Sequence, residues 1–336
     1  MSFENIRLEK GMYREGGKSF SQVLESLDPS EHYRGSALEG TDAFQRQLKR
    51  FDIRAKGTGS DNVEKFFQTF ESAVLFPEFI SRVVRQGMEE NNILPSIVAT
   101  VTNIDAMDYR SIYSDASDKD KKLADLAEGA SIPATTIRTR ENLIPLNTRG
   151  RMLVSSYEAL RFQKLDLFSV MLRQIGAYIQ RMHMDDVMAL INKEARVYEL
   201  SGTEIGGTAG SLDYNALVNF WAQFYPYEMN TMLASTGSMT SLLKLPELQN
   251  PLTGLNFQGT GKFGTPLGAQ MLLSSAVGDD MIVGLDQRYA IEMVRAGDVS
   301  VEYDKLIDRQ LERAAITSTC GFGIIMDGAV KCLKVK

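Results

Sequence analysis

Met107-Asp108-Tyr109-Arg110-Ser111-Ile112-Tyr113 alternates like a β-strand and opens a long, charged excursion of the chain, from residue 104 to residue 151. A tip rich in Asp and Lys follows at residues 114–122, and residues 137–144 return as a second extended limb. An isolated two-stranded ribbon is at best marginally stable in water, and a loop of this length in a compact domain usually has a function. We therefore predict an assembly arm that is ordered by lying on a neighbouring copy of the same protein.

The composition indicates a soluble protein with a full-sized core. The chain has 336 residues, of which 43% are hydrophobic and 24% charged, and its net charge of −6 argues against binding nucleic acid through its overall field. No apolar run approaches the roughly 20 residues of a membrane span, and residues 1–5 lack the pattern of a signal peptide. Cys320 and Cys332 form no Cys-x-x-Cys pair, which suits packed thiols in a reducing cytoplasm.

Residues 1–75 are predicted to form an N-terminal arm with little core of its own. A short apolar stripe ends at Asp28-Pro29, and a second helix begins near Asp42. That helix carries basic side chains (Arg46, Lys49, Arg50, Arg54 and Lys56), which we interpret as a solvated face in preference to a nucleic-acid contact. Asp61 and Glu64 fit the capping box of a third helix, and Phe76-Pro77 is expected to interrupt the helical pattern that continues to Met88. The arm is predicted to act in assembly more than in folding.

A long helix is predicted to be the spine of the main scaffold. Residues 152–154 form a short strand, Ser155 and Glu158 match a capping box, and Asp166 caps a helix from about residue 167 to 193. Its apolar stripe comprises Phe168, Met171, Leu172, Ile175, Ile179, Met182, Val187, Leu190 and Ile191. Strands near the C-terminus supply a partner sheet, because Ile316, Cys320, Phe322 and Ile324 alternate with small residues.

Residues 202–291 are predicted to form an inserted, compact α+β subdomain. A glycine-rich loop, residues 202–211, is followed by a helix that Asp213 caps. Buried strands are expected at 231–234, 271–273 and 281–285, with a helix around Leu242.

No catalytic, cofactor-binding or metal site is predicted. Residues 259–264 match G-x-G-x-x-G, but no strand leads in and Pro266 disfavours a helix start. His183 and Asp186 have helical i, i+3 spacing, but no second histidine accompanies them, so packing is favoured over a metal. Cys320 lacks a nearby base and is interpreted as a packed thiol.

The order of these elements resembles the major capsid proteins of tailed bacteriophages, which have the Hong Kong ninety-seven fold. The first motifs that carry the resemblance are Met107-Asp108-Tyr109, Ala-Glu-Gly-Ala-Ser-Ile-Pro at residues 127–133, and Thr-Arg-Gly-Arg-Met-Leu-Val-Ser-Ser-Tyr-Glu-Ala-Leu at 148–160. The others are Val283-Gly284-Leu285-Asp286, Val299-Ser300-Val301-Glu302 and Thr319-Cys320-Gly321-Phe322. The resemblance covers residues 76–335, and its short motifs are moderately specific only together.

The resemblance implies an α+β phage capsid fold. Residues 104–145 would be the extended E-loop, residues 202–291 the axial domain, and residues 76–103, 146–201 and 292–336 the peripheral domain with its spine helix and β-sheet. The protein would be structural, not an enzyme. It would assemble with itself as hexamers and pentamers into an icosahedral shell around packaged double-stranded DNA.

The partners implied are a portal, a scaffolding protein or maturation protease, and a decoration protein, with no membrane. The implied location is the virion, with assembly in the cytoplasm of the host bacterium. Members that crosslink covalently carry a lysine after Ala-Glu in the E-loop. Gly129 takes that place here, so we expect no covalent crosslinks.

Two alternatives stay open. Encapsulin nanocompartments share the fold and enclose enzymes, although they usually lack so long an N-terminal segment. An unrelated soluble enzyme that uses the glycine-rich loops would instead be a monomer or small oligomer with saturable ligand binding.

Overall fold

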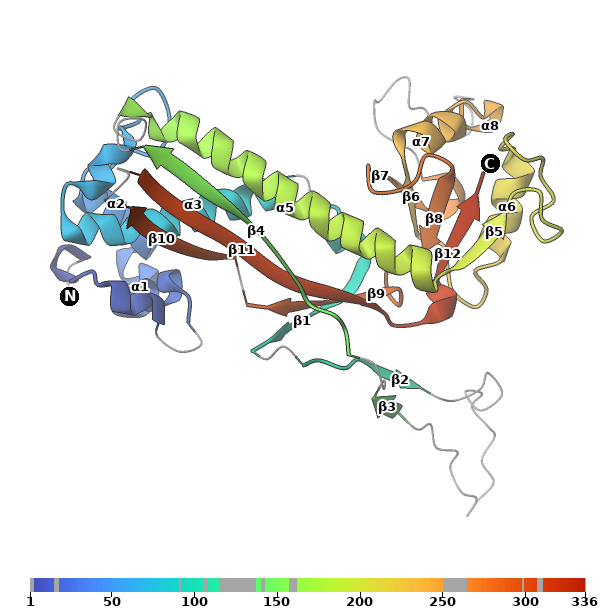
Figure 1. Ribbon diagram of the computed structural model, residues 1–336, viewed down its shortest axis with the longest axis horizontal. Coiled ribbons are helices and arrows are strands. Elements are labelled where there is room, and N and C mark those ends of the chain that lie inside the picture. Colours follow the sequence, from blue (N-terminus) through green and yellow to red (C-terminus); the bar gives the residue numbers. More distant parts are fainter. Residues whose placement is uncertain are drawn as a thin grey trace, which may run out of the picture. The chain divides into compact units, whose positions relative to one another are not determined.

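The computed structural model describes residues 3–14, 18–90, 92–105, 108–114, 137–139, 143–156, 162–249, 265–297, 299–306 and 311–335 (Figure 1). The helices are α1 (Phe20–Leu27), α2 (Ala43–Arg50), α3 (Phe70–Glu90), α5 (Leu165–Glu194), α6 (Tyr214–Ala222), α7 (Thr236–Leu243) and α8 (Pro246–Gln249). The strands are β1 (Val98–Ile104), β2 (Ile112–Ser114), β3 (Ile137–Thr139), β4 (Asn147–Ser156), β5 (Arg196–Glu199), β6 (Thr231–Ala234), β7 (Gln270–Leu273), β8 (Met281–Leu285), β9 (Ile291–Ala296), β10 (Ser300–Leu306), β11 (Leu311–Ile324) and β12 (Val330–Lys334). This mixture confirms the predicted α+β class.

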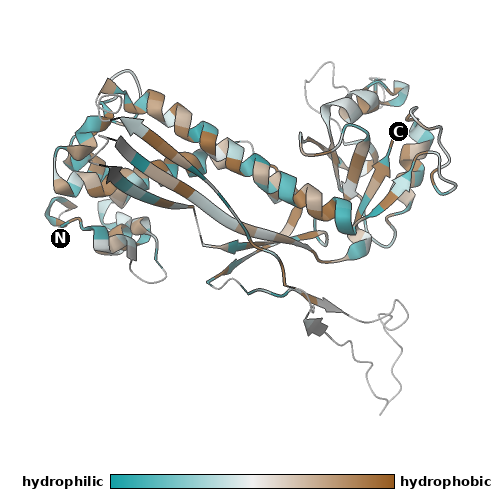
Figure 2. Ribbon diagram, viewed as in Figure 1, coloured by the Kyte–Doolittle hydropathy of each residue, from teal (hydrophilic) through white to brown (hydrophobic). Residues whose placement is uncertain are grey.

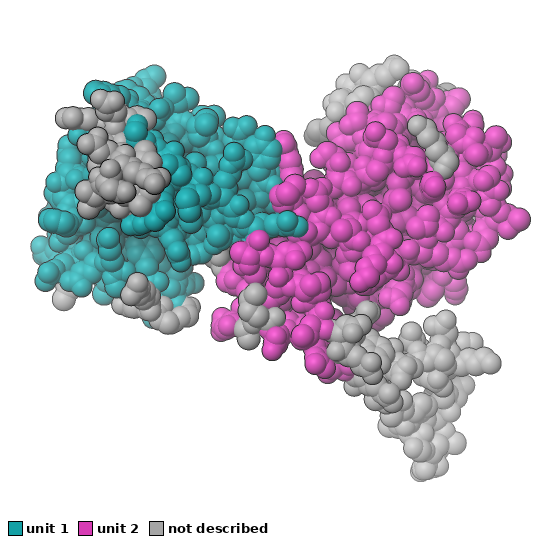
Figure 3. All heavy atoms as spheres, in the orientation of Figure 1, with its two compact units in different colours: residues 1–91, 149–180, 299–318 teal, residues 92–148, 181–298, 319–336 magenta. Residues whose placement is uncertain are grey.

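The chain divides into two compact units (Figure 3). Unit 1 comprises Met1–Asn91, Arg149–Gln180 and Val299–Ser318. Unit 2 comprises Asn92–Thr148, Arg181–Asp298 and Thr319–Lys336. No helix in the described part of the chain is both long and apolar enough to cross a membrane.

Helix α5 confirms the predicted spine, with 30 residues and alternating apolar and polar side chains (Figure 2). It begins at Leu165, so Asp166 lies in its first turn and does not cap it. Within unit 1, α5 approaches α3 closely, because a Cβ on Gly176 would lie only 2.1 Å from the carbonyl oxygen of Val84. Leu172, Ile175, Ile179, Val187 and Ile191 of the predicted stripe are buried.

A second apolar face of α5 is exposed. Met171 and Met182 were predicted in the buried stripe, but they are 56% and 40% exposed. Three further apolar side chains of α5 are exposed. Two of them are separated from Met171 by nearly whole helical turns and the third is next to it in the chain, and therefore all five project from one side of the helix. We call this set the exposed α5 face: Leu167, Val170, Met171, Tyr178 and Met182.

The N-terminal segment is part of the hydrophobic core of unit 1. Its buried side chains pack in one cluster with residues of α3 and α5: Ile6, Leu8, Met12, Phe20, Val23, Leu24, Phe44 and Ile53. The expectation that this segment adds little to the core is therefore wrong. Each apolar stripe of the N-terminal segment is short, but together these stripes pack on α3 and α5 in one hydrophobic cluster. Deleting residues 1–56 would uncover that surface, so the main domain should lose stability.

Two of the five basic side chains predicted to be solvated, Arg46 and Arg50, are instead ion-paired inside unit 1, whereas Lys49, Arg54 and Lys56 are exposed as predicted. Arg46 is 0% exposed, and its Nε donates to Oδ2 of Asp28 at 2.5 Å. Arg46 also lies 4.3 Å from the ring centroid of Tyr33, whose hydroxyl donates to Asp28 at 2.7 Å. Arg50 pairs with Glu71 at 2.9 Å. Lys49 is the one basic side chain within α2 that is exposed.

The predicted helix start at Asp61 is wrong. The segment Val63–Phe67 forms a 3₁₀ turn whose N-cap, Asn62, makes no side-chain cap hydrogen bond. Asp61 instead accepts hydrogen bonds from the Arg54 backbone N–H at 2.7 Å and from Lys65 at 3.1 Å.

Helix α3 passes through Pro77 without ending there, which corrects the predicted interruption. Proline lacks an N–H and displaces the backbone around it, which normally breaks a helix. Here the Tyr13 hydroxyl accepts from the Glu78 N–H at 3.0 Å and donates to the Val74 carbonyl at 2.8 Å. A side chain from the N-terminal segment thus bridges two backbone groups that α3 cannot join directly.

Unit 2 contains a five-stranded sheet in the order β5-β12-β8-β6-β7. One face packs on α6 and α7 through Met232, Ala234, Ile282 and Leu333, and the other face contributes Leu233, Val283 and Cys332 to a cluster with Val187 and Ile191 of α5. Both faces are covered, which explains why β6 is buried at every position. Asp213 caps α6 as predicted, accepting from Ala216 N–H at 2.7 Å. The sheet also takes β5 and β12 from outside residues 202–291.

A second sheet has the order β1-β9-β11-β10, with β4 also paired to β11. The predicted alternation of β11 is confirmed, because Ile316, Cys320, Phe322 and Ile324 are at most 5% exposed. The short helix predicted after Ser155 falls on residues 157–161, which lie outside the described residues.

Candidate assembly site

The described root of the predicted hairpin is a short antiparallel ribbon. In β2 and β3, Ile112 pairs with Thr139 and Tyr113 with Arg138. Two apolar side chains at this root face solvent: Ile112 is 59% exposed and Leu143 is 46% exposed. The tip, residues 115–136, lies outside the described residues, as does Gly129. The described ribbon therefore offers apolar surface but has no core of its own.

A buried carboxylate anchors this root to the sheet. Glu292 of β9 is 5% exposed and accepts hydrogen bonds from three hydroxyl groups. Oε1 accepts from Thr102 at 2.8 Å and from Tyr109 at 2.6 Å, and Oε2 accepts from Ser111 at 2.7 Å. Thr102 is on β1, whereas Tyr109 and Ser111 lead into the ribbon. Burial, followed by the hydrogen bond to Glu292, raises the pKa of Tyr109, so this hydroxyl keeps its proton and remains a donor.

The return limb is anchored on the same strand pair. Ile144 is 7% exposed, and its N–H donates to the Tyr109 carbonyl at 3.0 Å. It covers two glycines of β11, since a Cβ on Gly323 would lie 2.8 Å from Cδ1 of Ile144. A Cβ on Gly321 would lie 2.5 Å from the carbonyl oxygen of Pro145. Both limbs of the hairpin root are therefore held where β9 and β11 pair.

Asp286, in one of the capsid-like motifs, is also structural. It is 0% exposed and accepts from Glu228 N–H at 3.1 Å, from Asn230 at 2.9 Å and from Arg288 at 3.0 Å. Burial alone would raise the pKa of Asp286, but the hydrogen bonds from Arg288 and the Glu228 backbone outweigh it and lower the pKa. The aspartate joins the loop before β6 to the loop after β8.

The residues considered for chemistry are buried or lie outside the described ranges. His183 is 1% exposed within α5, and among the described residues no group of three His, Cys, Asp or Glu side chains is arranged to hold a metal. Cys320 is 1% exposed. Burial raises the pKa of Cys332 to about 12, which disfavours a reactive thiolate. The glycine motif at 259–264 lies outside the described residues.

Sequence reasoning missed the Glu292 anchor. Its donors lie up to 190 residues away in the chain, so no local spacing reveals them. The available signal was a single carboxylate among the apolar residues that begin β9, Ile-Glu-Met-Val. A charge in such a strand requires hydrogen-bond partners.

Comparisons with known proteins identify the fold. No protein-family model and no curated protein sequence matches the chain. A solved virus-like particle from Pyrococcus furiosus matches 76% of this chain and 98% of its own, with 12% identity and a TM-score of 0.52. The capsid of a native GTA particle matches 72% of this chain and 89% of its own, with 15% identity and a TM-score of 0.53. A structure of Mycobacterium phage Che8 matches 68% and 84%, with 14% identity and a TM-score of 0.52. The chain thus has the fold of capsid shell proteins, as the resemblance predicted.

Proposed function

We propose that this chain, which has a capsid shell fold, is a structural protein that assembles with itself into a closed icosahedral shell around double-stranded DNA. Hexamers and pentamers would be the building blocks. The observation that carries the proposal is the hairpin root, anchored through Glu292 and bearing the exposed side chains Ile112 and Leu143. Such a ribbon gains stability when a neighbouring subunit covers its apolar side.

The exposed α5 face is the surface that we propose to receive a neighbouring hairpin. It presents five apolar side chains along one helix, whereas the solvent-facing side of a helix usually carries polar and charged residues. We also propose the division into a peripheral domain, an E-loop at 104–145 and an axial domain at 202–291. A portal, a scaffolding protein or protease, and a decoration protein are further proposed partners, and the virion is the proposed location.

The second candidate is an encapsulin-type shell that encloses a cargo enzyme. It is supported by the match to the Pyrococcus furiosus virus-like particle, which is covered over 98% of its length. Genes for a portal and a terminase beside this gene would favour the phage capsid. A gene for a cargo enzyme would favour the nanocompartment.

Sedimentation of the purified protein tests the shell proposal. We expect capsomers or particles of megadalton mass, visible by negative-stain microscopy. Boiled particles should run on a denaturing gel as single chains near 37 kDa, because no lysine follows Ala127-Glu128. Ile112→Asp should reduce particle yield, whereas Leu27→Asp, at a position 49% exposed on α1, should not. A tight distribution of monomer and dimer at every salt and protein concentration would contradict the proposal.

A further inference from the structure

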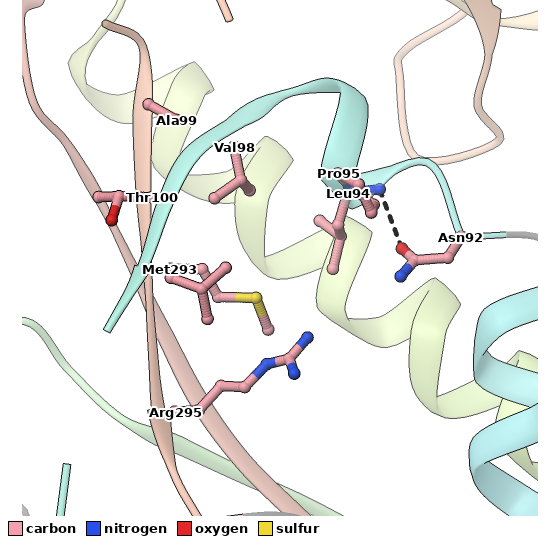
Figure 4. Close-up of a pocket in the computed structure, with 9 residues that line it drawn as sticks. Asn92, Leu94, Pro95, Val98, Ala99, Thr100, Met293 and Arg295 are labelled. Atoms are coloured by element: carbon pink, nitrogen blue, oxygen red, sulfur yellow. Dashed lines mark hydrogen bonds between the residues drawn. The ribbon is translucent and has the colours of Figure 1, made fainter. Parts of the chain in front are cut away.

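A pocket of about 260 Å³ opens beside β1 in unit 2 (Figure 4). Its apolar wall belongs to the core, because Leu94, Val98 and Met293 are at most 8% exposed and pack in one hydrophobic cluster. Asn92 fixes the start of this wall, since its side-chain oxygen accepts from the Leu94 N–H at 3.0 Å (Figure 4). The wall is therefore in place before a ligand arrives, so binding does not have to order it.

The charged group among the residues that line this pocket is the guanidinium of Arg295. Arg295 follows Met293 by two positions on β9, so both side chains project from the same face of the strand (Figure 4). Arg295 is half-buried, yet within the described residues it makes no hydrogen bond or ion pair. Glu292, the carboxylate of β9, projects from the opposite face and accepts from three hydroxyl groups. The guanidinium therefore has no counter-ion in the described part of the chain.

A partly buried cation of this kind favours an anionic ligand. Other arginines of the chain that are removed from solvent have carboxylate partners, namely Asp28 for Arg46 and Glu71 for Arg50. Withdrawing a cation from water without such a partner costs free energy, and an incoming carboxylate that accepts its hydrogen bonds offsets that cost. A small inorganic anion would leave the apolar wall beside it in contact with water. The pocket therefore suits an anion that also carries a hydrocarbon body.

The volume of the pocket limits the ligand to a small molecule. At about 30 Å³ for each water in the liquid, 260 Å³ corresponds to roughly nine waters, or to a ligand of about ten non-hydrogen atoms. A stable protein partner instead buries a surface of roughly 1,200–2,000 Å² in total. We propose that the pocket binds a linear monocarboxylate of about six to eight carbons, a short fatty acid. Its carboxylate accepts from Arg295, and its hydrocarbon chain lies on Val98 and Met293.

Isothermal titration calorimetry of the full-length protein with sodium octanoate tests the proposal, and we expect one site per chain. Hexanoate, which is two methylene groups shorter, should bind about tenfold more weakly. 1-Octanol, which keeps the chain but lacks the charge, should also bind about tenfold more weakly. Arg295→Met should reduce the affinity for octanoate about tenfold and leave the affinity for octanol unchanged. Arg34→Met is the matched control, since the Arg34 side chain is 78% exposed, and should change neither affinity.

A second variant decides the matter if circular dichroism shows that Arg295→Met is not folded. Val101 lines the pocket and is 47% exposed, so Val101→Glu should keep the fold and lower the affinity for octanoate about tenfold, because its carboxylate repels the ligand. Unchanged octanoate affinity in either folded variant would overturn the proposal, as would equal affinities for acetate and octanoate, or no octanoate binding up to about 1 mM. Loss of binding in Met171→Asp would also overturn it, by placing the ligand on the exposed α5 face. Particle formation is measured separately, because the pocket lies within unit 2 of a single chain.

Discussion

The Tyr109 hydroxyl lies 2.6 Å from Oε1 of Glu292, although 183 residues separate the two in the chain. This contact joins the start of the hairpin to the middle of β9. Thr102 and Ser111 complete the set of donors. The hairpin root is thus tied to the sheet by a buried carboxylate whose hydrogen-bond donors, among the described residues, are all neutral hydroxyl groups.

Tyr109→Phe should lower the free energy of unfolding by about 1.5–3 kcal/mol, because a hydrogen bond to a charged acceptor is lost in a buried place. Particle yield should also fall, since the hairpin root is less well held. Urea unfolding and sedimentation measure the two effects. Tyr225→Phe is the control, because Tyr225 is 89% exposed. Equal unfolding midpoints for the two variants would mean that the hydroxyl does not support the root.

Asp28→Ala should destabilise the protein by about 3–5 kcal/mol, because the fully buried Arg46 guanidinium loses the carboxylate at 2.5 Å and keeps only that of Glu25, 3.9 Å away. Glu31→Ala removes a carboxylate that lies 4.0 Å from Arg34, with both side chains exposed, and should cost less than about 1 kcal/mol. Thermal and urea unfolding provide the comparison. If Asp28→Ala unfolds like Glu31→Ala, the N-terminal segment folds independently of the core.

Tyr13→Phe should cost about 1–3 kcal/mol, because the Glu78 N–H and the Val74 carbonyl lose the hydroxyl that bridges them. Burial, followed by the Glu78 carboxylate, raises the pKa of Tyr13, so the hydroxyl stays protonated as a donor. Adding Pro77→Ala should reduce the cost, since α3 can then re-form its own hydrogen bond. A double-mutant cycle on unfolding free energies measures this coupling. Strict additivity would contradict the bridging role.

Stability should fall as pH rises above about 8.5, the ordinary pKa of a thiol. Burial raises the pKa of Cys332 to about 12 in the folded protein, so the neutral thiol is favoured there. Its contribution is complete below the unfolded-state pKa and is lost as pH rises toward the folded-state pKa. Between pH 8 and pH 9.5 the loss should be about 1 kcal/mol. Cys332→Ala should remove that pH-dependent part; an unchanged pH dependence would contradict the assignment.

The sequence predicted two kinds of element correctly: those with a long periodic pattern, and those determined by residues a few positions away. Helix α5 was placed to within two residues at its start, because its apolar stripe repeats over about eight turns. The predicted cap at Asp213 depends on a neighbour three residues away and is present, whereas the caps predicted at Asp61 and Asp166 are not. The predicted interruption at Pro77 rests on the usual effect of proline on a helix. It is wrong because the compensating hydroxyl comes from Tyr13, 61 residues from Val74, where no local pattern reveals it.

The assembly site was predicted only in part. The alternation of Tyr109, Ser111 and Tyr113 predicted an extended limb, but it did not reveal that two of these hydroxyls converge on one carboxylate. The same limit explains the error at Arg46. A basic residue on a short helix is usually solvated, and only the tertiary fold brings Asp28 and Tyr33 around it.

The neutral donors around Glu292 imply that ionic strength acts on this protein at two separate levels. Salt weakens attraction between exposed charges over a distance of about 8 Å under physiological conditions, but it barely affects a dry carboxylate held by hydroxyl groups. A rise in salt would therefore leave the hairpin root of each copy attached, and screening would not release the apolar contacts proposed between copies. Each copy therefore keeps the geometry of its assembly hairpin over a wide range of ionic strength, whatever salt does to the charges exposed on its surface.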